Sequence, residues 1–205
     1  MSVNVMSYSM GNWFICATRE NCAMRQGHLS IRFKFDKTEA TQVILWLLHR
    51  HGIMDKLKLV KMVFFADREH LARYGRPIVG GAYVAMPHGP VSSELLNYIN
   101  GVNTADERSF ELDGVNLRPR SLVNEEYLSE SDIAVLEDVD REYGRYDPWT
   151  LRNMTHQLKA YQKNYPPGSS NASLPLPYED FFLDLEDKGM LQIIREDQEA
   201  LADLE

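Results

Sequence analysis

The chain has 205 residues, 44% of them apolar, which is enough for one domain with a buried core and a small appendage. Its net charge of −8 disfavours a protein whose main task is to grip nucleic acid, because phosphate contacts need a basic face. Its two cysteines, Cys16 and Cys22, are too few for a disulfide scaffold, and their spacing is no zinc site. Neither a membrane-spanning run nor a signal-peptide pattern occurs, so we expect a cytoplasmic protein without a metal or cofactor.

The first 30 residues show no clear periodicity. They are either a disordered or partner-dependent tail or an upstream extension read into the frame, and the sequence leaves both open. Alternating apolar and basic residues predict a short strand over 31–35. Asp36, with Glu39 three residues later, predicts the start of a helix that Gly52 ends.

A second, longer helix is predicted from about Asp55 to Gly75. Apolar residues at three- and four-residue spacing form one face of it, and Asp67 lies within that face between Phe64 and Leu71. Burying a carboxylate without partners costs several kcal/mol, so Asp67 must be paired or hydrogen-bonded.

The segment after this helix changes character. Residues 78–86 are β-branched and aromatic around a Gly-Gly break, which predicts two short strands or one bent strand. Residues 87–90, Pro-His-Gly-Pro, predict a rigid turn. Pro90 then suits the first turn of a third helix over 91–99.

The remaining pattern is again mostly helical. Alternation around Asp113-Gly114 predicts a hairpin over 109–118, and Ser129 and Asp147 begin a fourth and a fifth helix. We therefore expect a mainly α fold of the α+β kind, a compact helical domain of about six or seven helices with a small β-hairpin and short strands. The predicted parts are an N-terminal extension over 1–30, the domain over 31–165, and a proline loop with an acidic helical segment over 166–205.

His88 is the most specific polar residue, because two prolines and a glycine fix its backbone. It is either a catalytic base or ligand, or a buried imidazole that pairs with Asp67 and holds the turn to the second helix. We favour the structural pair, since only Ser92 and Ser93 offer a nearby nucleophile and no catalytic set is evident. Other histidines suggest no chemistry: His70 reads as a surface residue and His156 as a packing residue.

The second helix also carries Arg68, Arg73 and Arg76 with Lys56, Lys58 and Lys61, and we place these basic residues on its outer side. One interpretation is a solvated face. The other is a landing site for an acidic partner, since interfaces are anchored by arginines that become buried.

Two blocks of the sequence resemble a known family. The string LKLVKMVFFADREHLARYGRPIVGGAYVAMPHGPVSSEL resembles the core of the Panacea domain, the SocA-like antitoxin domain, and LSESDIAVLEDVDREYGRYDPWTLRNMTH resembles its second block. The resemblance covers roughly residues 33–160. It implies a mainly helical, non-enzymatic cytoplasmic protein that neutralises a cognate toxin by binding it, in a bacterial or prophage toxin–antitoxin module with a recurrent role in phage defence.

The resemblance leaves the partner and its contact surface open. One family member is an adaptor that delivers its toxin to a protease, so a protease or chaperone partner, a homo-oligomer, DNA-binding autoregulation and a hydrolase using His88 stand as alternatives. The acidic charge balance argues against nucleic acid as a partner for this chain alone. The toxin-contacting residues that we predict are Arg68, Arg73, Arg76, Tyr83, Met86 and Val91.

Overall fold

The computed structural model describes residues 30–101, 109–185 and 188–202, and the structural statements below concern these residues. The α-helices are α1 Lys37–His51, α2 Lys56–Tyr74, α3 Ser93–Gly101, α4 Glu130–Tyr143, α5 Pro148–Gln157, α6 Lys159–Asn164 and α7 Gly189–Ala202. Two 3-10 helices are η2 Glu125–Tyr127 and η3 Tyr178–Asp184. The strands are β1 Met54–Asp55, β2 Tyr83–Met86, β3 Gly89–Ser92, β4 Phe110–Asp113, β5 Asn116–Pro119 and β6 Leu174–Pro175. The predicted mainly α fold with short strands is confirmed.

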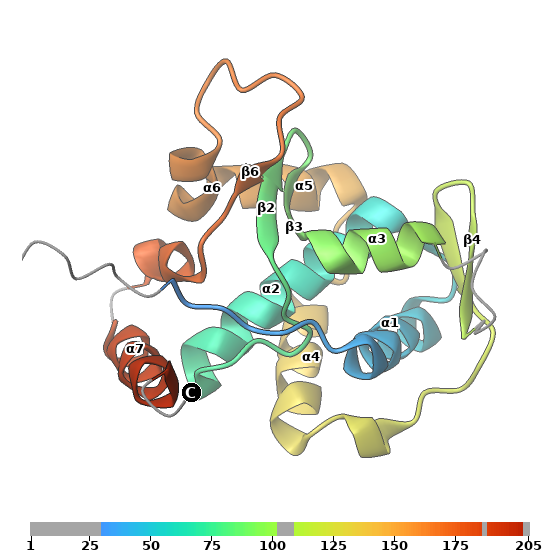
Figure 1. Cartoon of the computed structure of the whole chain (residues 1–205). Helices are drawn as coiled ribbons and strands as arrows, with labels where there is room; N and C mark the ends of the chain where they lie inside the picture. The colour runs from blue at the N-terminus through green and yellow to red at the C-terminus, as the bar shows by residue number, and fades with distance from the viewer. Residues whose placement is uncertain (1–29, 102–108, 186–187, 203–205) are drawn as a thin grey trace, which may run out of the picture.

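Helix α2 is the centre of the molecule (Figure 1). It packs against α1, α4, α5, α7 and strand β3, so nearly every layer of the fold touches it. Its ends follow the sequence signals: the Asp55 carboxylate accepts hydrogen bonds from the amides of Leu57 and Lys58. Gly75 ends the helix in the left-handed region, with φ 76°.

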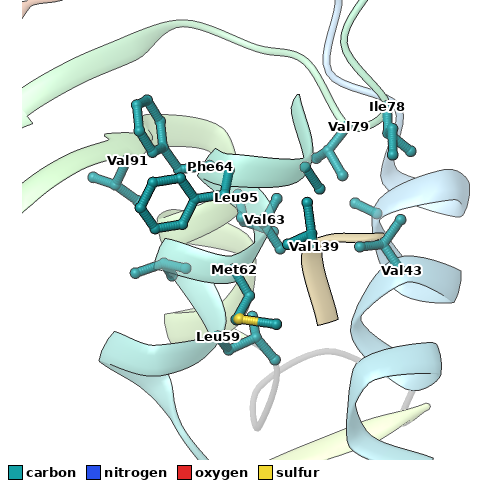
Figure 2. Close-up of a cluster of buried hydrophobic side chains, with 14 of the residues drawn as sticks. Val43, Leu59, Met62, Val63, Phe64, Ile78, Val79, Val91, Leu95 and Val139 are labelled. Atoms are coloured by element: carbon teal, nitrogen blue, oxygen red, sulfur yellow. The ribbon is translucent and has the colours of Figure 1, made fainter. Parts of the chain in front are cut away.

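The core lies around the middle of α2. Figure 2 shows Leu59, Met62, Val63 and Phe64 of this helix among side chains from α1, β3, α3 and α4. The Phe64 ring also meets Tyr83 and Phe181 edge-on, with centroids 5.7 and 5.3 Å away. Aromatic pairs prefer such edge-to-face contacts. Phe64, Tyr83 and Phe181 lie far apart in the sequence, and these contacts bring them together in one packed centre.

Two small antiparallel sheets flank this core. Strands β1, β5 and β4 form one sheet, and the predicted hairpin is the β4–β5 pair with Asp113 opposite Asn116. Strands β3, β2 and β6 form the other, in which Val84 lies opposite Val91. Strand β6 follows the proline loop, and it brings the segment after residue 166 back onto β2 (Figure 1).

Three local predictions are wrong. Residues 31–35 run extended without forming a strand, although the Gly81 amide bonds the Phe33 carbonyl. The strand predicted from residue 78 begins only at Tyr83. Pro90 lies in strand β3 rather than in a helix, opposite Ala85, and α3 starts at Ser93. A proline tolerates this edge position because no ladder hydrogen bond is required of its nitrogen.

Gly80 offers a test of the close packing beside α2. Its φ is +73°, and an added Cβ would lie 2.5 Å from the Lys34 carbonyl oxygen. Gly114 also has positive φ, +61°, but nothing lies within 4 Å of its Cβ position. We expect Gly80→Ala to lower the free energy of unfolding by about 2 kcal/mol more than Gly114→Ala. Both alanines are strained by the positive φ, but only the one at position 80 also clashes with the Lys34 carbonyl. Urea unfolding of both variants measures this, and equal losses would contradict the close approach.

Candidate functional site

Asp67 is fully buried and receives four hydrogen bonds. Its Oδ1 accepts from the amides of Ile78 (3.0 Å) and Val79 (2.8 Å). Its Oδ2 accepts from the Gly80 amide (3.0 Å) and the Tyr83 hydroxyl (2.9 Å). Burial raises the pKa of Asp67 to about 6, and the four donors oppose this rise by favouring the charged carboxylate.

The predicted pair between Asp67 and His88 is therefore wrong. Both carboxylate oxygens are taken by the loop that Gly75 turns back over the helix. His88 is exposed, and its ring lies edge-on to Trp149 with centroids 5.6 Å apart. Tyr83 is buried too, so its hydroxyl supports the fold rather than the exposed contact surface on which we placed it.

The tip of the β2–β3 hairpin is held through its carbonyl oxygens; it comprises the turn residues Pro87 and His88 with the strand ends on either side, and we call it the 86–90 turn. The Lys61 Nζ of α2 donates to the Pro90 carbonyl at 2.6 Å. The Arg152 guanidinium of α5 donates to the Pro87 carbonyl at 3.1 Å, and the Tyr161 hydroxyl of α6 donates to the Met86 carbonyl at 2.9 Å. Three helices thus fix this turn without using its side chains. We call these three hydrogen bonds the carbonyl clamp.

Lys61 is buried, with 1% of its surface exposed, and does not lie on the outer side of α2 where the sequence pattern placed it. Burial, with the Arg152 guanidinium adding to it, lowers the pKa of Lys61 to about 7. His156 stacks on Tyr161 with centroids 4.2 Å apart. Burial and the positive charges nearby lower the pKa of His156 to about 4. At neutral pH the Arg152 guanidinium is therefore the main positive charge of the clamp, because the lowered pKa values leave Lys61 only partly protonated and His156 neutral.

An apolar cleft of about 320 Å³ opens beside the clamp. Its walls are the start of α2, the 86–90 turn, the start of α5 and the β4–β5 turn, and Val91 and Leu96 also line it. Trp149 and Val115 at its edge are 58% and 55% exposed. The sequence analysis gave Trp149 no functional role, although its place beside Pro148, at the very start of a helix, is the signal that its ring could stay exposed.

Comparison with known protein families identifies the family of this chain. A family model described as "Antitoxin SocA-like, Panacea domain" matches residues 59–162, just over half of the chain. The chain belongs to this antitoxin family. No curated protein and no solved structure matches it.

The Panacea match spans the whole carbonyl clamp, from Lys61 to Tyr161, and all of the Asp67 contacts. The resemblance seen in the sequence is therefore confirmed, and family membership supports an antitoxin role in a toxin–antitoxin system. Among the described residues, no cluster of three or more His, Cys, Asp or Glu side chains could hold a metal ion. No described helix is long and apolar enough to cross a membrane.

A second buried polar group joins α2 to α4 within the Panacea match. His70 is fully buried, contrary to the surface position that we predicted. Its Nδ1 lies 2.7 Å from the Arg76 carbonyl, and its Nε2 lies 3.0 Å from Asp132 and 3.1 Å from the Ser131 hydroxyl. Burial alone would raise the pKa of Asp132, but hydrogen bonds from His70 and Ser129 and the Arg76 charge hold it low.

This group does not form a catalytic triad. In a triad, the carboxylate holds the imidazole nitrogen opposite the one that faces the nucleophile. Here Asp132 and the Ser131 hydroxyl share Nε2, and a backbone carbonyl occupies the far nitrogen. The group instead ties two helices together.

The predicted contact arginines are engaged within the Panacea domain. Arg73 pairs with Glu69 at 2.7 Å and Asp138 at 2.6 Å, and Arg76 pairs with Asp132 at 2.9 Å. Their side chains still keep 38% and 42% exposure, so a partner could reach them. Arg68 is partly buried, and its Nε has no hydrogen-bond partner among the residues that the structure describes. Met86 and the buried Val91 line the apolar cleft.

Replacing Asp67 by asparagine tests its role. The side chain keeps its size, but one acceptor oxygen becomes an NH₂ group that faces donors. We expect Asp67→Asn to lower the free energy of unfolding by about 3 kcal/mol, because buried donors lose their acceptor. Asp113→Asn, where the side chain is 77% exposed, should change it by less than about 0.5 kcal/mol. Chemical unfolding measures both, and similar losses would show that Asp67 is not the anchor.

Lys61 makes stability depend on pH. The ordinary pKa of a lysine is 10.5 and the pKa of Lys61 in the folded protein is about 7, so between these pH values the unfolded chain holds a proton that the folded chain has released. Stability therefore rises with pH in this interval. From pH 7 to pH 9, the free energy of unfolding of the wild type should rise by roughly 2 kcal/mol relative to Lys61→Met. Parallel pH dependence of the two proteins would contradict a depressed pKa.

Proposed function

We propose that the chain is the antitoxin of a bacterial or prophage toxin–antitoxin pair and neutralises its toxin by direct protein–protein binding in the cytoplasm. The observation that carries this proposal is the Panacea family match over residues 59–162, the part of the chain that holds the clamp and most of the cleft. Phage defence is the context that we propose for the pair. The role is non-catalytic.

The geometry supports binding in two ways. The 86–90 turn and the starts of α2 and α5 are held by side chains within the fold, so this surface needs little ordering when a partner arrives. An exposed tryptophan beside an apolar cleft is also typical of a residue that anchors an interface. Arg73 and Arg76 remain candidates for a second contact region on the α2–α4 side.

The proposal is tested with the product of the adjacent gene. We expect its induction to arrest growth of a bacterial host, and co-expression of this chain to restore growth and yield a complex that co-purifies. Asp67→Asn, expected to be poorly folded, should restore growth less. Arrest that persists with the folded wild-type chain, together with no co-purification, would refute antitoxin activity against that product.

Measuring the amount of toxin separates two modes of neutralisation. Direct inhibition leaves the toxin level unchanged, because the toxin is held in the complex. An adaptor that delivers the toxin to a protease would instead lower its level, and this loss would depend on the protease.

A further inference from the structure

We propose that the apolar cleft is the docking site for the toxin, and that it receives a large apolar side chain standing next to a carboxylate. This inference rests on the proposed antitoxin function. It names a surface and a partner chemistry that family membership does not supply.

The apolar part of the inference rests on Trp149 and Val115. Both are more than half exposed at the edge of a hollow that is otherwise lined mainly by apolar side chains such as Leu57, Val60 and Leu96. Aromatic residues that become buried at the centre of an interface contribute most of its binding energy. A volume of about 320 Å³ suits one large side chain, or two, rather than a whole helix.

The charged part rests on the surroundings of the cleft. Helices α2 and α5 both begin at it, and the positive ends of their dipoles point toward it. The carboxylates of Asp55 and Asp147 are already engaged in capping these two helices. Lys56, Lys61 and His88 stand among the lining residues, and the Arg152 guanidinium binds the Pro87 carbonyl of the turn.

Lys56 and Arg152 are the cations beside the cleft that keep their charge at neutral pH, and neither forms an ion pair within the described part of the chain. Complementary charge speeds association and selects partners. An acidic residue beside the inserted apolar side chain is therefore the chemistry that fits.

The experiment uses the full chain and the purified product of the adjacent gene. Trp149→Ala should weaken binding by about 30-fold, because it removes the aromatic anchor. The control is Tyr127→Ala, which removes an equally exposed aromatic ring (55%) that does not line the cleft, and should change the Kd by less than about twofold. Melting temperatures show whether each variant is folded.

A charge reversal tests the acidic partner residue. Lys56→Glu should weaken binding and reduce its dependence on salt, since attraction between exposed charges is screened. Lys34→Glu changes the net charge equally at an exposed site outside the cleft and should leave the Kd close to that of the wild type. A lysine substituted for one acidic residue of the partner should restore the affinity of Lys56→Glu.

The outcomes separate the two proposals. If the folded Trp149→Ala and Lys56→Glu proteins bind as tightly as the wild type and still restore growth, the antitoxin function stands and the docking site is wrong. If the wild type neither binds nor restores growth, the proposed function falls and the docking site with it. If Trp149→Ala abolishes self-association of the chain and leaves toxin binding intact, the cleft receives a second copy, which also overturns the inference.

Discussion

Four donors converge on the buried carboxylate of Asp67, and three of them are consecutive main-chain amides, those of Ile78, Val79 and Gly80. This arrangement solves two problems together. The amides of a buried loop need acceptors, and a buried carboxylate needs donors. Because Asp67 belongs to the central helix, meeting both needs determines where the chain runs after α2, and therefore where β2 begins.

The position of β2 then determines the site. Strand β2 leads into the 86–90 turn. The turn can bind Lys61 of α2, Arg152 of α5 and Tyr161 of α6 only if β2 begins where the Asp67 hydrogen bonds place it. Gly89 shows how close this approach is: its φ is +91°, and a Cβ there would lie 2.6 Å from the Thr155 hydroxyl and 3.0 Å from the Lys61 Nζ. The carbonyl clamp and the cleft beside it thus depend on a carboxylate that lies elsewhere in the core.

Sequence reasoning recovered what is set by local chemistry. The ends of α2, the β4–β5 hairpin and the buried position of Asp67 follow from capping residues, a turn signal and helical spacing. The donors to Asp67 could not be read in this way. His88 was the conspicuous polar residue, whereas the real donors are backbone amides, which every residue except proline carries.

The sequence analysis also failed to predict that two polar side chains of α2 are buried. Lys61 and His70 were placed at the surface because their residue types usually lie there. Lys61 is instead directed at a carbonyl of a turn 29 positions further along the chain, and His70 at Asp132 on α4. Such pairings depend on tertiary contacts that no periodicity encodes. The cleft could not be predicted for the same reason, because its walls come from elements far apart in the sequence, among them α2, β3, α3 and α5.

The clamp also suggests how one scaffold can serve different partners. Its three bonds end on carbonyl oxygens of Met86, Pro87 and Pro90, so the side chain of His88 at the exposed end of the turn takes no part in holding it. Trp149 and Val115 are likewise more than half exposed and bear little of the core. Substitutions at these positions would alter the cleft while leaving the Asp67 anchor and the clamp intact. Specificity can therefore change at the edge of the cleft at little cost to stability, because the fold and the proposed contact surface depend on different atoms.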